Sequence, residues 1–247
     1  MLFQPAIPPG PPATPETFYT HMSLGEAALD SRPYVVCNFV SSADGKATAQ
    51  GRTALLGGQG DRAMFHLLRT QVDAILAGTG TLRVERYGPL VREPRLANIR
   101  VAEGRTPQPL GVIISRSGDI PFDIPLFASQ ESRVAIYAPE SVDVPQCSAA
   151  VTVHDLPPVD GVLGSVLHSL RHEHDVRSLL CEGGPTLFAS LLAHDLVDEL
   201  FLTIAPTLVG GDELGITRGV SLAELIQLRL VRALEHEGTL FLRYARA

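Results

Sequence analysis

Apolar positions along the chain repeat with two different periods, and the alternation between them predicts an α/β fold. Residues 33–40, PYVVCNFV, form a continuous apolar run with β-branched side chains, which is typical of a buried strand. Residues 61–70 carry apolar side chains at helical spacing, with Asp61 at the start and Arg69 near the end, as the helix dipole favours. Strands that alternate with helices predict a mostly parallel central sheet flanked by helices. Further strands are predicted at 72–78, 110–115, 133–138, 149–154 and 176–180, and further helices at 161–173 and 185–195.

The N-terminal end departs from this alternation. Prolines crowd residues 4–15, so we expect a mobile, polyproline-like tail that joins neither a helix nor a sheet. A short helix is predicted within residues 17–30. Residues 1–31 would therefore be a Pro-rich tail with a short helix, and residues 32–247 a single domain, because no linker divides them.

The C-terminal end predicts antiparallel structure. Residues 225–246 alternate apolar and polar side chains about Glu237 and Gly238, which is the pattern of a closing antiparallel hairpin. Residues 198–211, DELFLTIAPTLVGG, predict either a strand pair or one long bent strand. Residues 41–58 are polar and interrupted by glycines, so a loop is expected there.

Composition narrows the class of protein. The 247 residues are 45% hydrophobic and carry a formal charge of −7, with no basic face that would suit nucleic acid. The three cysteines, Cys37, Cys147 and Cys181, form no C-x-x-C pair, which favours a reducing compartment. No apolar stretch reaches membrane-spanning length, and no signal peptide is evident. We expect a cytoplasmic protein that does not bind membranes.

Three predicted strands end in residues that suit phosphate groups. Gly78–Thr81, Ser115-Arg116 and the stretch from Glu182 to Thr186 each follow a strand, and parallel strands bring such ends to one edge of a sheet. Glycines let the backbone approach a ligand closely, and the start of a helix favours an anion. A serine beside an arginine suits the 2′-phosphate of NADP. The alternatives are plain strand-to-helix turns and a solvated arginine.

Two carboxylates stand at strand ends and are candidates for chemistry. Asp44 follows the first strand and is expected to handle a proton or anchor a substrate, with a raised pKa in a closed cleft. The alternative is an ordinary Asp-Gly turn. Glu182 either caps the next helix or contacts a ligand. His172 and His174 do not share a helix face, so no metal site is expected.

The sequences RPYVVCNFVSSADGKAT, DAILAGTGT, GVIISRS, CEGGPTL and DELFLTIAPTLVGG follow one another in an order that resembles the reductase domain of riboflavin biosynthesis. That family of pyrimidine reductases has a dihydrofolate-reductase-like fold. The resemblance runs from Arg32 to about Gly211. The H-x-E and P-C-x-x-C elements of the deaminase domain are absent, so the chain resembles a divergent, stand-alone, actinobacterial-type member.

The resemblance implies NADPH as the hydride donor, a phosphorylated pyrimidine as substrate and a homodimer built through the sheet edge or the C-terminal hairpin. Family members reduce the ribosyl side chain of such a pyrimidine to a ribityl chain. Asp44 is the expected catalytic residue. The expected cofactor-binding residues are Ser42, Gly78, Thr79, Gly80, Thr81, Ser115, Arg116, Glu182, Gly183, Gly184, Pro185, Thr186 and Leu187.

The chain differs from the family on the substrate side. Asn38 stands where the family commonly has a lysine, and Arg86-Tyr87 stands in place of Asn-Pro after the acidic Glu85. From the resemblance, the prediction is a reductase of the 5-amino-6-(5-phosphoribosylamino)uracil type. The alternatives are a dihydrofolate or pterin reductase of the same fold and a non-catalytic NADP-binding regulatory protein. The expected substrate contacts, with surface ion pairing as the alternative, are Asn38, Asp44, Arg62, Glu85, Arg86 and Tyr87.

Overall fold

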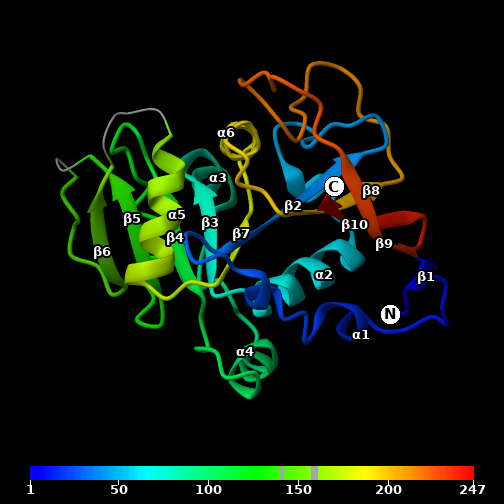
Figure 1. The fold of residues 1–247 in the computed structure, drawn as a ribbon, viewed down its shortest axis with the longest axis horizontal. Helices are drawn as coiled ribbons and strands as arrows, with labels where there is room; N and C mark the ends of the chain where they lie inside the picture. Colours follow the sequence, from blue (N-terminus) through cyan, green and yellow to red (C-terminus); the bar gives the residue numbers. More distant parts are fainter. Residues whose placement is uncertain (140–141, 157–160) are drawn as a thin grey trace. The chain divides into compact units, whose positions relative to one another are not determined.

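The computed structural model describes residues 1–139, 142–156 and 161–247, in which strands and helices alternate as the apolar pattern predicts (Figure 1). The chain divides into two compact units, and each is assembled from separate stretches of sequence. Neither unit begins at the expected boundary near residue 32. Unit 1 comprises Met1–Met22, Val35–Leu68 and Pro185–Ala247, and unit 2 comprises Ser23–Tyr34 and Arg69–Gly184.

Unit 2 contains a parallel sheet. Its strands run in the order β7-β3-β4-β5-β6, and every pairing between them is parallel. The predicted strands are thus confirmed, and the apolar residues of β3, β4 and β7 are buried, as is typical of a parallel sheet with both faces covered. The strands are β3 (Ala74–Gly78), β4 (Leu110–Ile114), β5 (Arg133–Ala138), β6 (Ala150–Asp155) and β7 (Ser178–Cys181), and the helices are η1 (Leu24–Ala27), α3 (Thr79–Glu85), α4 (Pro94–Ala102) and α5 (Val162–Glu173).

Unit 1 contains a mixed sheet. The order is β1-β9-β10-β8-β2, with β2 and β8 parallel and the other pairs antiparallel. The predicted hairpin is confirmed, because β9 and β10 pair across Glu237 and Gly238, both at positive φ. The strands are β1 (Gln4–Ile7), β2 (Tyr34–Ser42), β8 (Glu199–Ala205), β9 (Leu228–His236) and β10 (Thr239–Arg246), and the helices are α1 (Pro15–Tyr19), η2 (Thr53–Leu55), α2 (Gln59–Thr70) and α6 (Pro185–Ala193).

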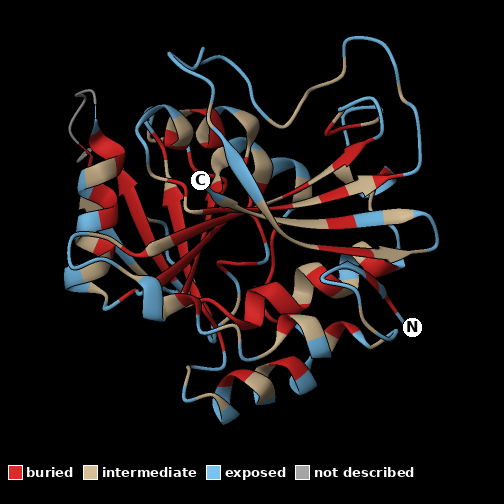
Figure 2. Cartoon of the chain, turned by 45° about the vertical axis from the view of Figure 1, so that its right-hand side comes forward, coloured by how far each residue is buried: buried red, intermediate tan, exposed pale blue. Residues whose placement is uncertain are grey.

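Buried residues concentrate on the strands and on the inner faces of the helices (Figure 2). In unit 1 the ring of Phe39 on β2 lies 4.6 Å from that of Phe188 on α6, and Tyr19 meets Phe201 edge to face. In unit 2 the inner face of α5 is apolar and buried. Among the helices that the structure describes, none combines the length and apolar character that a membrane span requires.

The expectation of a mobile N-terminal tail is wrong. β1 pairs with β9, and Phe3 is fully buried between His236 and Phe241, at ring distances of 4.7 and 5.0 Å. Proline is tolerated there because β1 is an edge strand, so a missing N–H on its outer side breaks no ladder bond.

Two other expectations need correction. The short helix expected within residues 17–30 is replaced by two shorter pieces, α1 and η1. In residues 198–211 only Glu199–Ala205 forms a strand, and the rest continues as a loop because Pro206 lacks the N–H that would extend the ladder.

Candidate active site

The two glycine-rich turns contact each other at the carboxyl ends of β3 and β7. The N–H of Gly78 donates to the carbonyl oxygen of Gly183 at 2.9 Å. A Cβ on Gly78 would stand 3.4 Å from the backbone nitrogen of Gly184, and one on Gly184 would stand 3.3 Å from Oγ1 of Thr81. The two turns are therefore in close contact as well as hydrogen-bonded.

Gly183 and Gly80 have different reasons to be glycine. Gly183 adopts a φ of +91°, which side chains rarely accept. Gly80 is exposed, and a Cβ built on it meets nothing within 4 Å. The turn at Gly80 thus presents bare backbone to solvent, as the approach of a ligand requires.

The third strand end, Ser115-Arg116, follows β4, which pairs in parallel with β3. Ser115 is buried, and its hydroxyl oxygen has no hydrogen-bond partner within the part of the chain that the structure describes. Arg116 is exposed, and no hydrogen bond or ion pair ties its guanidinium to the described residues. An unpaired buried hydroxyl calls for a partner, so this edge fits a phosphate-bearing ligand.

The carboxylate of Glu182 is already occupied by protein groups. Arg69 donates to both of its oxygens, from Nε and Nη2 at 2.7 Å each, and the hydroxyl of Tyr87 donates to Oε2 at 2.6 Å. Burial raises the pKa of Tyr87 well above its ordinary value, and the negative charge of Glu182 adds to the effect. The side chains of Glu182 and Tyr87 are thus buried and bonded to other protein groups, and their expected contacts with cofactor and substrate stay predictions.

Asp44 accepts hydrogen bonds at the protein surface. Its Oδ1 accepts from the hydroxyl of Ser42 at 2.6 Å and from the N–H of Val209 at 3.1 Å, and its Oδ2 accepts from the N–H of Gly210 at 2.7 Å. The Ser42 bond, followed by the two backbone bonds, lowers the pKa of Asp44 to about 2. The expected raised pKa is wrong, because these bonds favour the charged form and outweigh desolvation.

A hollow of about 730 Å³ opens beside Asp44 in unit 1, lined by Thr48, the two residues after it, Gly51 and residues 207–214. Thr48 donates through its hydroxyl to Glu213 Oε2 at 2.5 Å, and that bond lowers the pKa of Glu213. Nζ of Lys46 donates to the carbonyl oxygen of Gly211 at 2.7 Å. Sequence reasoning missed this hollow, and the one signal available was that Lys46 is the sole lysine of the chain.

The other expected substrate contacts lie in both units. In unit 2, Arg86 forms an exposed ion pair with Asp123 at 2.9 Å, as the surface alternative predicts, and Glu85 is half-buried. In unit 1, Arg62 donates to the carbonyl oxygen of Gly57 at 3.0 Å, and Asn38 is half-buried on β2.

The remaining expected cofactor residues occupy the starts of two helices. Thr79 opens α3 and is half-buried. Pro185, Thr186 and Leu187 form the first turn of α6, which belongs to unit 1, and Thr186 is exposed there. Pro185 fits this position because the first helical turn needs no N–H from it.

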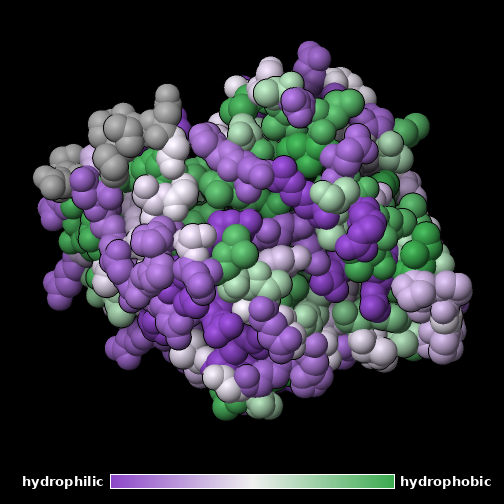
Figure 3. All heavy atoms as spheres, viewed as in Figure 1, coloured by the Kyte–Doolittle hydropathy of each residue, from purple (hydrophilic) through white to green (hydrophobic). Residues whose placement is uncertain are grey.

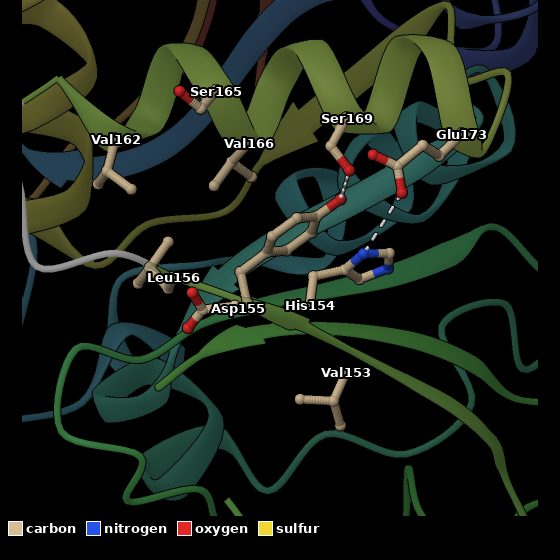
Figure 4. Close-up of a pocket in the computed structure, with 10 residues that line it drawn as sticks. Val153, His154, Asp155, Leu156, Val162, Ser165, Val166, Ser169 and Glu173 are labelled. Atoms are coloured by element: carbon tan, nitrogen blue, oxygen red, sulfur yellow. Dashed lines mark hydrogen bonds and ion pairs between the residues drawn. The ribbon is translucent and has the colours of Figure 1, made fainter. Parts of the chain in front are cut away.

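A second hollow, of about 430 Å³, lies between α5 and the strands β5 and β6 (Figure 4). His154 on β6 points toward Glu173 on α5, with 3.5 Å between Nδ1 and Oε2, and its Nε2 lies 3.0 Å from Nε2 of His174. No cluster of three or more metal-ligating side chains occurs in the described ranges.

Comparison with known proteins places these features in a family. A family model described as the RibD C-terminal domain matches residues 33–240. A protein of Archaeoglobus fulgidus named 2,5-diamino-6-ribosylamino-4(3H)-pyrimidinone 5′-phosphate reductase is 32% identical over 186 residues, which cover 73% of this chain and 83% of the relative. The protein of the same name from Methanothermobacter thermautotrophicus is 34% identical and is covered to 81%.

Solved structures show the same fold. A pyrimidine reductase-like protein from Corynebacterium diphtheriae superposes with a TM-score of 0.79 at 24% identity, covering 95% of this chain and 99% of that one. The riboflavin biosynthesis reductase Rib7 of Saccharomyces cerevisiae superposes with a TM-score of 0.68 at 20% identity, covering 94% and 97%. The α/β fold with a C-terminal antiparallel hairpin is therefore shared with these proteins.

Proposed function

Because the chain belongs to the RibD C-terminal domain family, we propose that it is an NADPH-dependent reductase of a phosphoribosylamino-pyrimidine. The observation that carries the proposal is the interlocked pair of turns at Gly78 and Gly183, in a chain about one third identical to two named pyrimidinone phosphate reductases. The preferred substrate is the diamino-pyrimidinone phosphate of those relatives. Its ribosyl group would be reduced to a ribityl group.

NADPH would supply the hydride, and the chain would hold it along the carboxyl edge of the unit 2 sheet. The bare backbone at Gly80 suits the diphosphate. The unpaired hydroxyl of Ser115 and the guanidinium of Arg116 suit the 2′-phosphate, which distinguishes NADPH from NADH.

The residues of unit 1 would hold the substrate rather than move its proton. Reduction of a carbon–nitrogen or carbon–oxygen double bond needs one proton for each hydride. Asp44 is ionised at neutral pH, because its pKa is about 2, so it does not donate that proton. We assign Asp44 instead to fixing Val209 and Gly210, which line the hollow where the pyrimidine would bind.

A titration with NADPH and with NADH tests the cofactor. The unaltered protein should bind NADPH more tightly than NADH, and Arg116→Ala should remove the preference. Arg95→Ala, which changes an exposed arginine on α4, is the control and should leave the preference intact. Equal affinity of the unaltered protein for both nucleotides would contradict the assignment of Arg116.

A turnover assay tests the substrate. NADPH should be consumed in the presence of the diamino-pyrimidinone phosphate and not with dihydrofolate. Consumption with dihydrofolate alone would favour a pterin reductase, and tight NADPH binding without turnover would favour a regulatory protein.

We also propose that the protein is a homodimer, as the family resemblance implies. Unit 1 exposes large apolar side chains in residues 206–227, including Leu208 at 77% and Leu225 at 89% exposure. Figure 3 shows hydrophobic residues on the surface of this part, which Figure 1 draws in orange. Such residues favour association. Light scattering after size-exclusion chromatography measures the molar mass, and a monomer at all concentrations would exclude the homodimer.

A further inference from the structure

Three buried polar side chains meet directly before the Gly183 turn, and the proposed reaction uses none of them. Arg69 and Glu182 form a two-pronged ion pair, with side-chain exposures of 6% and 2%. Tyr87 completes it through its hydroxyl, so Oε1 of Glu182 accepts one hydrogen bond and Oε2 accepts two. We call Arg69, Tyr87 and Glu182 the buried triad.

The triad joins segments that lead to both glycine turns. Glu182 immediately precedes Gly183. Tyr87 follows α3, the helix that begins at the first turn. Arg69, near the end of α2, also donates from Nη1 to the carbonyl oxygen of Leu90 at 2.9 Å, so one guanidinium holds the chain after α3 and the residue before Gly183.

Stability alone does not account for such a cluster. Removing two charges from water carries a desolvation penalty that a buried ion pair recovers only with good geometry, and apolar residues of similar volume often serve as well. A fully hydrogen-bonded network does fix the relative placement of its members. The forked contact of Arg69 fixes direction as well as distance, which a lysine does not.

We propose that the buried triad positions the two glycine turns for the cofactor diphosphate. Arg69, Tyr87 and Glu182 are positioning residues in this inference, which rests on the proposed function. The carboxylate fixes the chain entering Gly183, while Tyr87 and Leu90 fix the chain leaving α3. The hydrogen bond between Gly78 and Gly183 connects the two turns, so the loss of one member of the triad should make both turns more mobile.

Tyr87→Phe is the sharpest test, because it removes one hydroxyl and keeps the ring that packs against Arg69. Tyr137→Phe is the matched control, since it removes a hydroxyl bonded to Ser169 at 2.9 Å elsewhere in unit 2. Amide hydrogen exchange of the protein without cofactor should rise in peptides covering residues 178–187 for Tyr87→Phe and not for Tyr137→Phe. The dissociation constant for NADPH should rise about tenfold, the lower end of the effect of losing a hydrogen bond to a charged group. Affinity for the pyrimidine substrate should not change.

If Tyr87→Phe is poorly folded, Glu182→Gln takes its place in the same two measurements, with the same expected results. The amide keeps the shape of the side chain and one acceptor oxygen. Unchanged exchange and unchanged NADPH affinity in a folded Tyr87→Phe would overturn the inference alone. Equal effects of the two tyrosine variants would also overturn it, since they would show a general loss of stability. If the unaltered protein binds no NADPH, the proposed function fails and the inference falls with it.

Discussion

The N–H of Gly78 lies 2.9 Å from the carbonyl oxygen of Gly183, and this hydrogen bond joins the ends of β3 and β7. Each turn was expected to be glycine-rich for the sake of a ligand. The geometry separates Gly78, Gly183 and Gly184, where the turns contact each other or the backbone takes a positive φ, from Gly80, which faces open space. That separation makes the ligand role testable without disturbing the fold.

Gly80→Ala should weaken NADPH binding while leaving the fold intact. Alanine is favoured over glycine within a helix by about 0.5–1 kcal/mol, so the free energy of unfolding should stay level or rise. The dissociation constant for NADPH should rise roughly tenfold, which corresponds to about 1.4 kcal/mol of lost contact. Gly164→Ala on α5 is the control, because a Cβ there also meets nothing within 4 Å. Equal NADPH affinity in both variants would remove the diphosphate from this turn.

Asp44 should influence acid stability and not the pH profile of turnover. Its folded-state pKa of about 2 lies below the ordinary 3.8, so its carboxylate stabilises the fold above pH 4. This contribution is lost as the pH falls from about 4 toward 2. Urea unfolding of Asp44→Asn against the unaltered protein should show a difference at neutral pH that shrinks in acid.

For Asp44→Asn, the plot of turnover rate against pH should keep its shape between about pH 5 and pH 9. A group that stays ionised over this range causes no rise or fall of the rate with pH. If the rate of the unaltered protein changes with pH and this change is lost in Asp44→Asn, Asp44 is the proton donor after all.

Breaking the Arg69–Glu182 pair should destabilise the protein strongly. Arg69→Met leaves a buried carboxylate without its cation, and such losses typically cost about 3–5 kcal/mol of unfolding free energy. The double variant Arg69→Met, Glu182→Met should recover part of that loss, because no unpaired charge remains. Urea denaturation measures both. A double variant as unstable as the sum of the single ones would show that the two side chains act independently.

Phe3 should contribute as much as a core residue despite its place beside the N-terminus. Phe3→Ala removes a fully buried ring and should cost about 3–5 kcal/mol. Leu2→Ala is the control, since Leu2 is 59% exposed and should change little. Thermal unfolding measures both variants. Equal unfolding midpoints would show that Phe3 contributes no more to stability than an exposed residue.

The sequence pattern predicted the elements whose apolar residues have a clear period. β2 to β7, α5, α6 and the closing hairpin follow from alternation and run length alone. α4 was not predicted, because its apolar residues do not gather on one face and because it buries Arg100. That guanidinium donates to four backbone carbonyls, and burial lowers its pKa to about 10, a placement that no periodicity indicates.

The sequence pattern marked turns that depend on local backbone conformation and missed environments that depend on long-range partners. Glycine and proline at strand ends mark turns locally, so Gly78, Gly80, Gly183 and Pro185 could be singled out. The environment of Glu182 depends on Arg69, which is distant in sequence, and that of Asp44 depends on Gly210. A local pattern contains neither partner, so the direction of the Asp44 pKa shift was wrong.

The discontinuous make-up of the two units sets an order for synthesis on the ribosome. Every residue of unit 2 has been made once Gly184 is added, so its parallel sheet can form while the chain is still growing. β1 and β2 are made early, but their partners β9 and β8 come after that point. Unit 1 therefore completes its sheet only after β8, β9 and β10 have been made. A nascent chain halted before Thr239 lacks β10, the strand that links β9 to β8, and leaves the edges of β8 and β9 open to association with other chains.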